Sequence, residues 1–379
     1  MFSRGGRRRA VFALPLLLMA GLLTATATAA PAEAAPVRSH GYVHADKPDA
    51  PEGESYAPRR SVNSAGGENK VVRAGTGEYW VFMAELGTRR DSNRGVAHVT
   101  AHGTSNAYCS IRYISRYSAE AAPEAWTGVW LSLRCFTPEG ALTDSEFTAS
   151  WANAETAEGH SGFAYLTTSQ LNSHMPPAEQ RYNSSGYGIK VVHLAPGSYE
   201  VQLIGQGGGA YDPEAELGHV QVTAAQAAFG AERCTVGGIE SAYEPARVKV
   251  YCHDVGGAPR DTLFSLTFAR KASLVRTPLG MYTRARGTDY EEPDRQWTWD
   301  ALGEPTAVSG GSGSEEGRYW VKTPMSEYFR EGNVQVTAEG SDGRYCKVAQ
   351  WSAEEALEVR CFNGKGDPTR SPFLVSYAY

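Results

Sequence analysis

The stretch NVQVTAEGSDGRYCKV, residues 333–348, joins a strand-like run, a polar turn and a cysteine nine residues after its threonine. HVTAHGTSNAYCSI (98–111) has the same spacing, and QVTAAQAAFGAERCTV (221–236) has a closely similar one. A pattern that recurs three times along one chain indicates an internal repeat.

Three further motifs recur in step with the first. GEYWV, GSYEV and GRYWV place a tyrosine at positions 120 residues apart: Tyr79, Tyr199 and Tyr319. A strand ending in cysteine follows in each copy, and a phenylalanine comes 12 residues after that cysteine. A period of about 110 to 120 residues is too long for a solenoid unit and corresponds to a whole small domain. We therefore predict three domains at 41–152, 162–270 and 280–379, here called repeats 1, 2 and 3.

Each repeat has the pattern of an all-β domain. Runs such as YWVFMAEL and VWLSLRC alternate apolar and polar residues, and clusters of Gly, Ser, Asn and Pro separate them. About seven short strands in ~100 residues are typical of an immunoglobulin-like β-sandwich. The sequence thus predicts three tandem sandwiches of this kind, without fixing their strand order.

The six cysteines fall two to a repeat. Six cysteines allow 15 pairings, but the repeat symmetry selects one disulfide within each domain: Cys109–Cys135, Cys234–Cys252 and Cys346–Cys361. Each should stabilise its domain by about 3 kcal/mol. No CxxC pair is present, so cysteine-bound zinc is not expected, and the sequence predicts neither a metal nor a cofactor.

The pattern NVQVTA…YCKV…VRCF…S.F.VSY resembles that of uncharacterised secreted bacterial proteins built from tandem repeats of about 110 residues. The similarity covers the chain from residue 41 onward and is closest in repeats 1 and 3. Repeat 2 departs from it at His253, where the other two copies have Phe136 and Phe362. The resemblance implies secretion and repetition, and it implies no particular activity.

Residues 1–35 have the organisation of a secretory signal peptide. A basic segment precedes the apolar run VFALPLLLMAGLL (11–23), and small residues that suit cleavage follow. No later apolar run is long enough to span a bilayer, so we expect a secreted, extracellular protein without membrane insertion.

The charge of the chain disfavours polyanionic partners. Cleavage after Ala30 removes four arginines (Arg4, Arg7, Arg8 and Arg9) and takes the formal net charge from −6 to −10. An acidic chain is repelled by phosphate backbones and anionic lipids, so nucleic acid is not an expected partner.

Catalytic motifs are absent from the sequence. There is no G-x-S-x-G nucleophile motif, and the nine histidines share no equivalent position in the three repeats. We predict surface positions for these histidines and expect no enzymatic activity.

Large aromatic residues stand at alternate positions that strand phase directs away from the core. Repeat 1 has Trp80, Phe82 and Trp130 there, and repeat 3 has Trp320, whereas repeat 2 has charged and polar residues. Exposed aromatics can stack on sugar rings or anchor a protein partner, although they can also cover a neighbouring domain.

Three functional interpretations follow from the sequence. The first is a secreted, non-catalytic protein that binds a polysaccharide or protein at the cell surface or in the medium through these aromatics. The second is an exported inhibitor of a protease or other hydrolase, presenting the disulfide-braced segment between Cys109 and Cys135. The third is a hydrolase on a β scaffold, which needs paired carboxylates or a histidine in a cleft.

Overall fold

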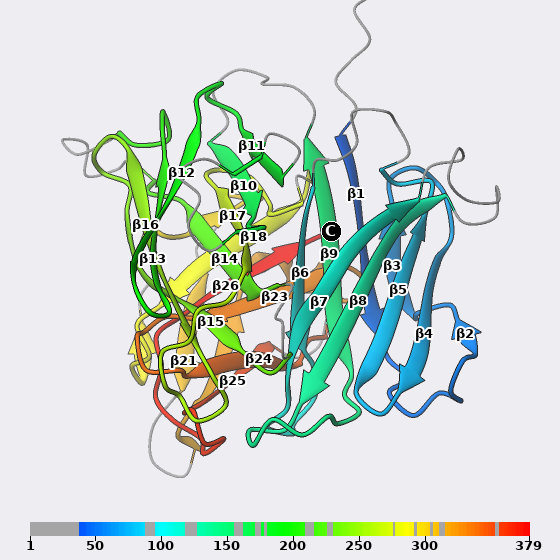
Figure 1. The fold of residues 1–379 in the computed structure, drawn as a ribbon. Helices are drawn as coiled ribbons and strands as arrows, with labels where there is room; N and C mark the ends of the chain where they lie inside the picture. Colours follow the sequence, from blue (N-terminus) through cyan, green and yellow to red (C-terminus); the bar gives the residue numbers. More distant parts are fainter. Residues whose placement is uncertain are drawn as a thin grey trace, which may run out of the picture. The chain divides into compact units, whose positions relative to one another are not determined.

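The computed structural model describes residues 38–87, 95–117, 127–154, 162–170, 176–177, 180–208, 216–225, 230–275, 277–291, 294–303, 306–310, 315–352 and 356–379. The predicted signal peptide lies outside these residues. Pro36–Tyr379 forms one compact unit. Its regular structure is almost entirely β-strand, with a 3-10 helix, η4, at Pro324–Tyr328 (Figure 1). Among the described residues, no helix has the length and hydropathy needed to cross a membrane.

The strands form six antiparallel sheets, two in each repeat. In repeat 1 the first sheet has the strand order β3 (Arg60–Asn63), β1 (Arg38–Ala45), β9 (Phe147–Ala154), β6 (Val96–Ala101). The second sheet has the order β2 (Ser55–Tyr56), β4 (Asn69–Gly75), β5 (Glu78–Ala84), β8 (Gly128–Phe136), β7 (Tyr108–Tyr117). In repeat 2 the first sheet has the order β11 (Arg181–Asn183), β10 (Phe163–Thr167), β17 (Phe264–Ala269), β14 (His219–Ala224). The second sheet has the order β12 (Ile189–Ala195), β13 (Ser198–Leu203), β16 (Ala246–His253), β15 (Arg233–Glu240). In repeat 3 the first sheet has the order β20 (Trp299–Asp300), β18 (Gly280–Ala285), β26 (Phe373–Ala378), β23 (Asn333–Ala338). The second sheet has the order β19 (Tyr290–Glu291), β21 (Ala307–Gly310), β22 (Arg318–Lys322), β25 (Leu357–Phe362), β24 (Tyr345–Gln350).

The two sheets of each repeat pack face to face around an apolar core. In repeat 1 the side chains of Val81 and Leu131 from one sheet meet Val99, Phe147 and Trp151 from the other. Repeats 2 and 3 have corresponding cores. Burial of this apolar area, at about 25 cal/mol per Å², is the main stabilising contribution to each sandwich. The prediction of an all-β sandwich fold is confirmed.

The strand order differs from that of an immunoglobulin domain. In antibody domains the disulfide joins the two sheets. Here Cys109–Cys135, Cys234–Cys252 and Cys346–Cys361, the three predicted pairs, each join neighbouring strands of one sheet. The second and third strands of the larger sheet, β4 and β5, also form a hairpin within that sheet. The likeness to immunoglobulin domains is therefore limited to two packed antiparallel sheets.

The GxYxV motif fixes the turn between β4 and β5 and ties it to the segment that precedes β9 of the other sheet. Gly77 has a φ of 67°, and a Cβ there would lie 2.7 Å from the carbonyl oxygen of Cys135, so glycine is required. The Gly77 amide and the Tyr79 hydroxyl both donate to Asp144, at 2.8 and 3.1 Å. Repeat 2 reproduces this arrangement at Asp261. These partly buried hydrogen bonds account for the motif in repeats 1 and 2. In repeat 3 Arg370 replaces the aspartate, and the Tyr319 hydroxyl donates to the Gly287 carbonyl oxygen at 3.4 Å.

The three repeats contact one another in a closed ring. Isolated parallel bridges join His102 of repeat 1 to Val348 of repeat 3, Glu339 of repeat 3 to Val236 of repeat 2, and Ala225 of repeat 2 to Ile111 of repeat 1. These residues occupy equivalent positions in their repeats. Each sandwich therefore uses the same two segments to contact its two neighbours.

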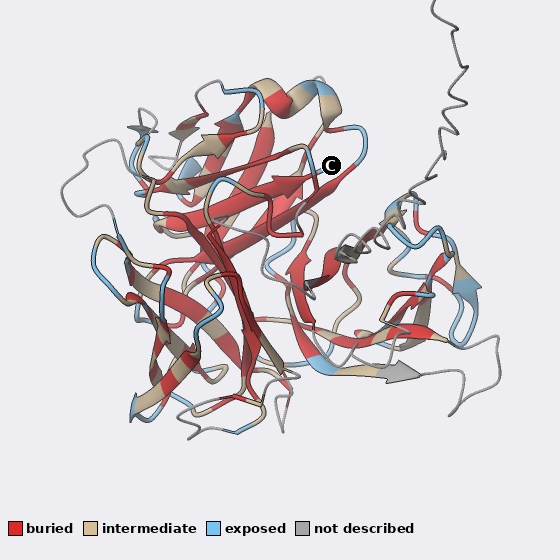
Figure 2. Cartoon of the chain, turned by 90° about the horizontal axis from the view of Figure 1, so that it is seen from above, coloured by how far each residue is buried: buried red, intermediate tan, exposed pale blue. Residues whose placement is uncertain are grey.

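The Val-Thr-Ala strands β6, β14 and β23 lie at the centre of this ring. Every residue of these strands is buried. Figure 2 shows, in red, how much of the β-structure of the chain is buried. One face of each strand enters the core of its own repeat, and the other face contacts the neighbouring repeats. We call this contact region the junction. Except for Val96, the outward residues of the three strands are polar, so the repeats meet through hydrogen bonds as well as apolar packing.

Candidate functional site

Three of the four predicted outward aromatics form one face on repeat 1. Trp80 and Phe82 lie on β5, and Trp130 lies beside them on β8, directly opposite Phe82. The Trp130 ring is 4.6 Å from Phe82 and 6.4 Å from Trp80 between centroids. Trp80 is 41% exposed, whereas Phe82 is only 8% exposed. We call these three residues the aromatic face.

The aromatic face extends toward the strand at the sheet edge. Tyr113 on β7 stands opposite Ser132, which also stands opposite Trp80, and Tyr113 is 41% exposed. Lys70 and Val72 on β4 stand opposite Phe82 and Trp80 on the other side. The outer face of this sheet thus offers exposed ring surface bordered by Lys70 and by the Glu78–Arg134 ion pair at 2.7 Å. Exposed rings suit stacking against an apolar ligand surface.

Trp320 lies separately, on the equivalent sheet of repeat 3. The Arg318 guanidinium covers its ring at 4.6 Å, and Glu358 stands opposite it on β25. Glu358 also accepts hydrogen bonds from Arg318 and Arg360, at 2.8 and 2.7 Å. The structure therefore pairs Trp320 with a cation and does not bring it together with the aromatic face.

The segment between Cys109 and Cys135 is mostly a β-hairpin and not a long loop. Its strands β7 and β8 pair in register, with a bulge between Ile111 and Tyr113. The hairpin tip, 118–126, lies outside the described residues. Most of the segment that the inhibitor hypothesis requires as a loop thus lies within the sheet as strands β7 and β8.

Two histidines and a glutamate from repeat 1 meet beside repeat 3. His44 lies on β1, His102 follows β6 and Glu146 precedes β9, and donor atoms of all three lie within 4.8 Å of one another. The Oε2 atom of Glu146 is 3.2 Å from His44 Nε2 and 2.8 Å from His102 Nδ1. We call these three residues the His–Glu cluster. Two imidazoles and one carboxylate are a donor set found in zinc and non-haem iron sites.

The electrostatics of the His–Glu cluster favour an ionised Glu146 and a neutral His102. Hydrogen bonds from His102 and His44 lower the pKa of Glu146 to about 2. Burial lowers the pKa of His102 below its ordinary value, although its hydrogen bond to Glu146 opposes this. A neutral imidazole can still donate one N–H to the carboxylate, so the two shifts are compatible.

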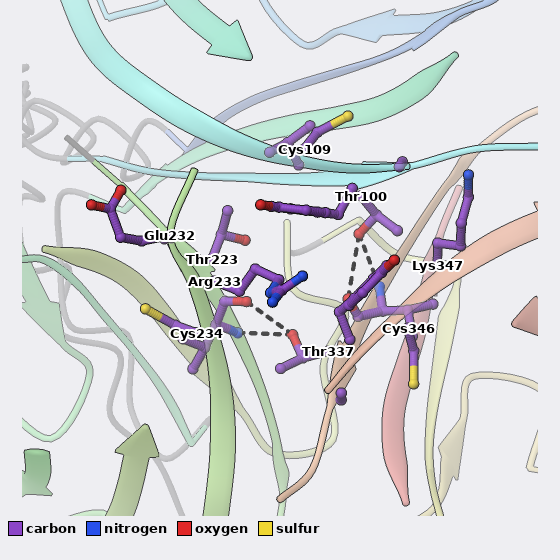
Figure 3. Close-up of a pocket in the computed structure, with 17 residues that line it drawn as sticks. Thr100, Cys109, Thr223, Glu232, Arg233, Cys234, Thr337, Cys346 and Lys347 are labelled. Atoms are coloured by element: carbon purple, nitrogen blue, oxygen red, sulfur yellow. Dashed lines mark hydrogen bonds between the residues drawn. The ribbon is translucent and has the colours of Figure 1, made fainter. Parts of the chain in front are cut away.

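A cavity of about 50 Å³ lies within the junction (Figure 3). The three repeats line it with equivalent residues: Thr100, Thr223 and Thr337, and Tyr108, Arg233 and Tyr345. Figure 3 shows Arg233 among the labelled residues from all three repeats. Its guanidinium lies between two tyrosine rings, 4.7 and 5.0 Å from their centroids, and its Nη2 donates to three carbonyl oxygens. These contacts make Arg233 a structural link between repeats.

The prediction that the histidines lie on the surface is wrong for several of them. His98 and His219 are 2% and 0% exposed at the junction, and His44 and His253 are also buried. His98 hydrogen-bonds Thr223 at 3.0 Å and Thr267 at 2.8 Å, both in repeat 2. Strand phase correctly places His98 outside the core of its own sandwich, but the neighbouring sandwich covers it.

Compared with known protein families, curated proteins and solved structures, the chain matches none. Its three disulfides leave no free cysteine among the described residues, which suggests an oxidising, extracellular environment.

Proposed function

We propose that this chain is an exported, non-catalytic binding protein whose aromatic face holds a polysaccharide. In this proposal the three predicted ranges, 41–152, 162–270 and 280–379, are copies of one domain type. The resemblance to secreted tandem-repeat proteins and the signal-like N-terminus support export. No nucleic acid and no inserted membrane segment take part.

The observation that carries the proposal is the exposure of Trp80 beside Trp130. An indole ring buries a large apolar area when it stacks, and the C–H face of a pyranose ring is a suitable partner. The buried Phe82 supports Trp130 from the next strand at 4.6 Å, so the face is braced before any ligand arrives. A braced face loses little side-chain entropy on binding, which favours affinity.

Repeat 2 provides an internal contrast. At the positions equivalent to Trp80 and Trp130 it has Glu200 and Arg247, whose side chains approach as an ion pair at 3.9 Å between β13 and β16. A charged pair of this kind is typical of a sheet face that is exposed to solvent. The same sheet in repeat 1 carries two indoles instead, and this difference supports repeat 1 as the binding repeat.

The test is retention of the purified chain on insoluble chitin, cellulose and peptidoglycan. We expect the unmodified chain to sediment with at least one of them, and a Trp80→Ala, Trp130→Ala, Trp320→Ala variant to stay in solution. Separate Trp80→Ala and Trp320→Ala variants assign the effect, which we expect to lie with Trp80.

A matched control is Tyr187→Ala, which removes an aromatic side chain that is 65% exposed on repeat 2. It should sediment like the unmodified chain. If the unmodified chain is not retained on any of the three polymers, the sugar proposal fails and a protein partner becomes the better search. Equal retention of the triple variant would move the site away from these aromatics.

A further inference from the structure

We infer that the His–Glu cluster, His44, His102 and Glu146, binds one divalent transition-metal ion, and that this ion is zinc. This site is separate from the aromatic face, so its test does not depend on whether the proposed polysaccharide binding is correct.

The three donor groups converge on one point from three separate segments of repeat 1. The backbone holds two of them together, because the His102 amide donates to the Glu146 carbonyl oxygen at 2.8 Å. His44 faces them from β1, where it stands opposite Thr148, two residues after Glu146. The strand pairing therefore places all three side chains before any metal is bound.

The distances between donors suit a tetrahedral ion after small movements. Zinc bonds of about 2.0 to 2.2 Å place neighbouring tetrahedral ligands about 3.4 Å apart. The Glu146 carboxylate oxygen lies 3.2 and 2.8 Å from the two imidazole nitrogens. An ion can thus replace the two hydrogen bonds by a shift of a few tenths of an ångström to about one ångström in each side chain.

The protonation pattern of His44 leaves it able to bind. Its Nε2 faces Glu146, while its buried Nδ1 has no hydrogen-bond partner. Because the ionised Glu146 carboxylate can only accept, Nε2 of His44 carries the ring proton in the metal-free chain. Metal binding at Nε2 would move this proton to Nδ1, which leaves the Nε2 lone pair free to ligate the metal.

The surroundings close one side of the cluster and leave another open. Trp351 of repeat 3 packs against both imidazoles, with ring centroids 4.9 and 5.0 Å away. The Glu146 side chain is 36% exposed, so solvent reaches the carboxylate. Three protein ligands and an open fourth position accommodate a water molecule or a donor atom from a ligand.

The other two repeats show that the fold itself does not require these residues. At the same three positions, repeat 3 has Arg284, Glu339 and Pro372, and repeat 2 has Thr167, Ala225 and Leu263. The backbone hydrogen bond between the second and third positions is 2.8 Å long in each of the three repeats. In repeat 3 an Arg284–Glu339 ion pair fills the space. Only repeat 1 combines two imidazoles and a carboxylate here.

The test is a zinc titration of the full chain without a polyhistidine tag, after treatment with a chelator. We expect one Zn²⁺ per chain with micromolar or tighter affinity, measured by calorimetry, and a higher Tm in its presence. Co²⁺ in place of Zn²⁺ should give the visible absorption of a tetrahedral site. His102→Ala and Glu146→Gln should each weaken binding by roughly tenfold or more.

Glu146→Gln keeps the size and a hydrogen-bond acceptor of the native side chain, so it separates loss of metal from loss of fold. The matched control is His193→Ala in repeat 2. It removes a histidine that is paired with Asp261 at 2.8 Å and lies outside the His–Glu cluster. It should bind zinc like the unmodified chain. Absence of stoichiometric zinc binding, or equal binding by His102→Ala and Glu146→Gln, would overturn the inference.

Discussion

The hydroxyl of Thr337 donates to the carbonyl oxygen of Val222 at 3.0 Å, and the Val222 amide donates to the same hydroxyl at 3.0 Å. One threonine of repeat 3 thus satisfies both backbone groups of a residue on the free edge of β14. Thr100 likewise accepts from the Val336 amide at 3.1 Å, but its hydroxyl donates to the side-chain oxygen of Gln335 at 2.8 Å. Unpaired strand edges are prone to aggregation, and at the junction each is covered by a neighbouring repeat.

Thr337→Val should destabilise the chain, because it leaves the amide and carbonyl of Val222 buried without their hydroxyl partner. The side chain keeps its shape, so the expected loss is the cost of two unsatisfied groups, about 1 to 3 kcal/mol in the free energy of unfolding. Urea unfolding followed by tryptophan fluorescence measures it. Thr104→Val, at an exposed position, serves as the control and should change little. Equal stability of Thr337→Val and the native chain would show that the junction hydrogen bonds do not contribute.

His98→Gln should reduce the acid sensitivity of the chain. Burial lowers the pKa of His98 to about 3, whereas a histidine in an unfolded chain titrates near 6.5. Between these values the unfolded chain binds a proton that the folded chain does not, so the free energy of unfolding falls as the pH falls from about 6.5 toward 3. By about pH 5 the loss reaches roughly 2 kcal/mol.

Glutamine is a suitable replacement because Gln221 and Gln335 occupy the equivalent positions in repeats 2 and 3. Unfolding at about pH 7.5 and pH 5 should therefore show a smaller pH-dependent loss for His98→Gln than for the native chain. His219 also has its pKa lowered to about 3 by burial, so the His98→Gln, His219→Gln double variant should show less loss again. Identical pH dependence of all three proteins would contradict this account.

Much of the fold could be predicted from the sequence, because it depends on patterns within one repeat. Alternation identified the strands, and repeat symmetry identified the partners of all six cysteines. The junction could not be predicted, because strand phase shows only that a residue such as His98 points away from its own core. Whether solvent or another sandwich lies there depends on how the domains pack. The one available signal was the threonine kept at the same outward position in all three copies.

The His–Glu cluster was also beyond sequence patterns. His44 and Glu146 are 102 residues apart and meet because β1 pairs with β9 near the far end of the repeat. No short motif marks such a site. The aromatic face was predictable because Trp80 and Phe82 share one strand, but the burial of Phe82 and the arginine covering Trp320 depend on side-chain packing.

Phe82→Ala and Trp80→Ala should differ in their effect on stability. Phe82 is 8% exposed and packs beneath Trp130, so its removal leaves a cavity that costs about 3 kcal/mol. Trp80 is 41% exposed, and its removal should cost about 1 kcal/mol or less. Thermal unfolding of the two variants measures the difference. A larger loss for Trp80→Ala would mean that Trp80 supports the fold and is poorly suited to be a ligand contact.

Removal of a disulfide should destabilise the chain through its unfolded state. The Cys346–Cys361 bridge spans 15 residues of sequence, and the double variant Cys346→Ala, Cys361→Ala should lose about 3 kcal/mol. The Cys109–Cys135 bridge spans 26 residues, and its loss should cost about 0.5 kcal/mol more, because a longer loop gains more entropy when it is released. Urea unfolding of the two double variants tests this order. Unchanged stability after either replacement would contradict the prediction and would mean that the bridge does not lower the entropy of the unfolded chain enough to stabilise the fold.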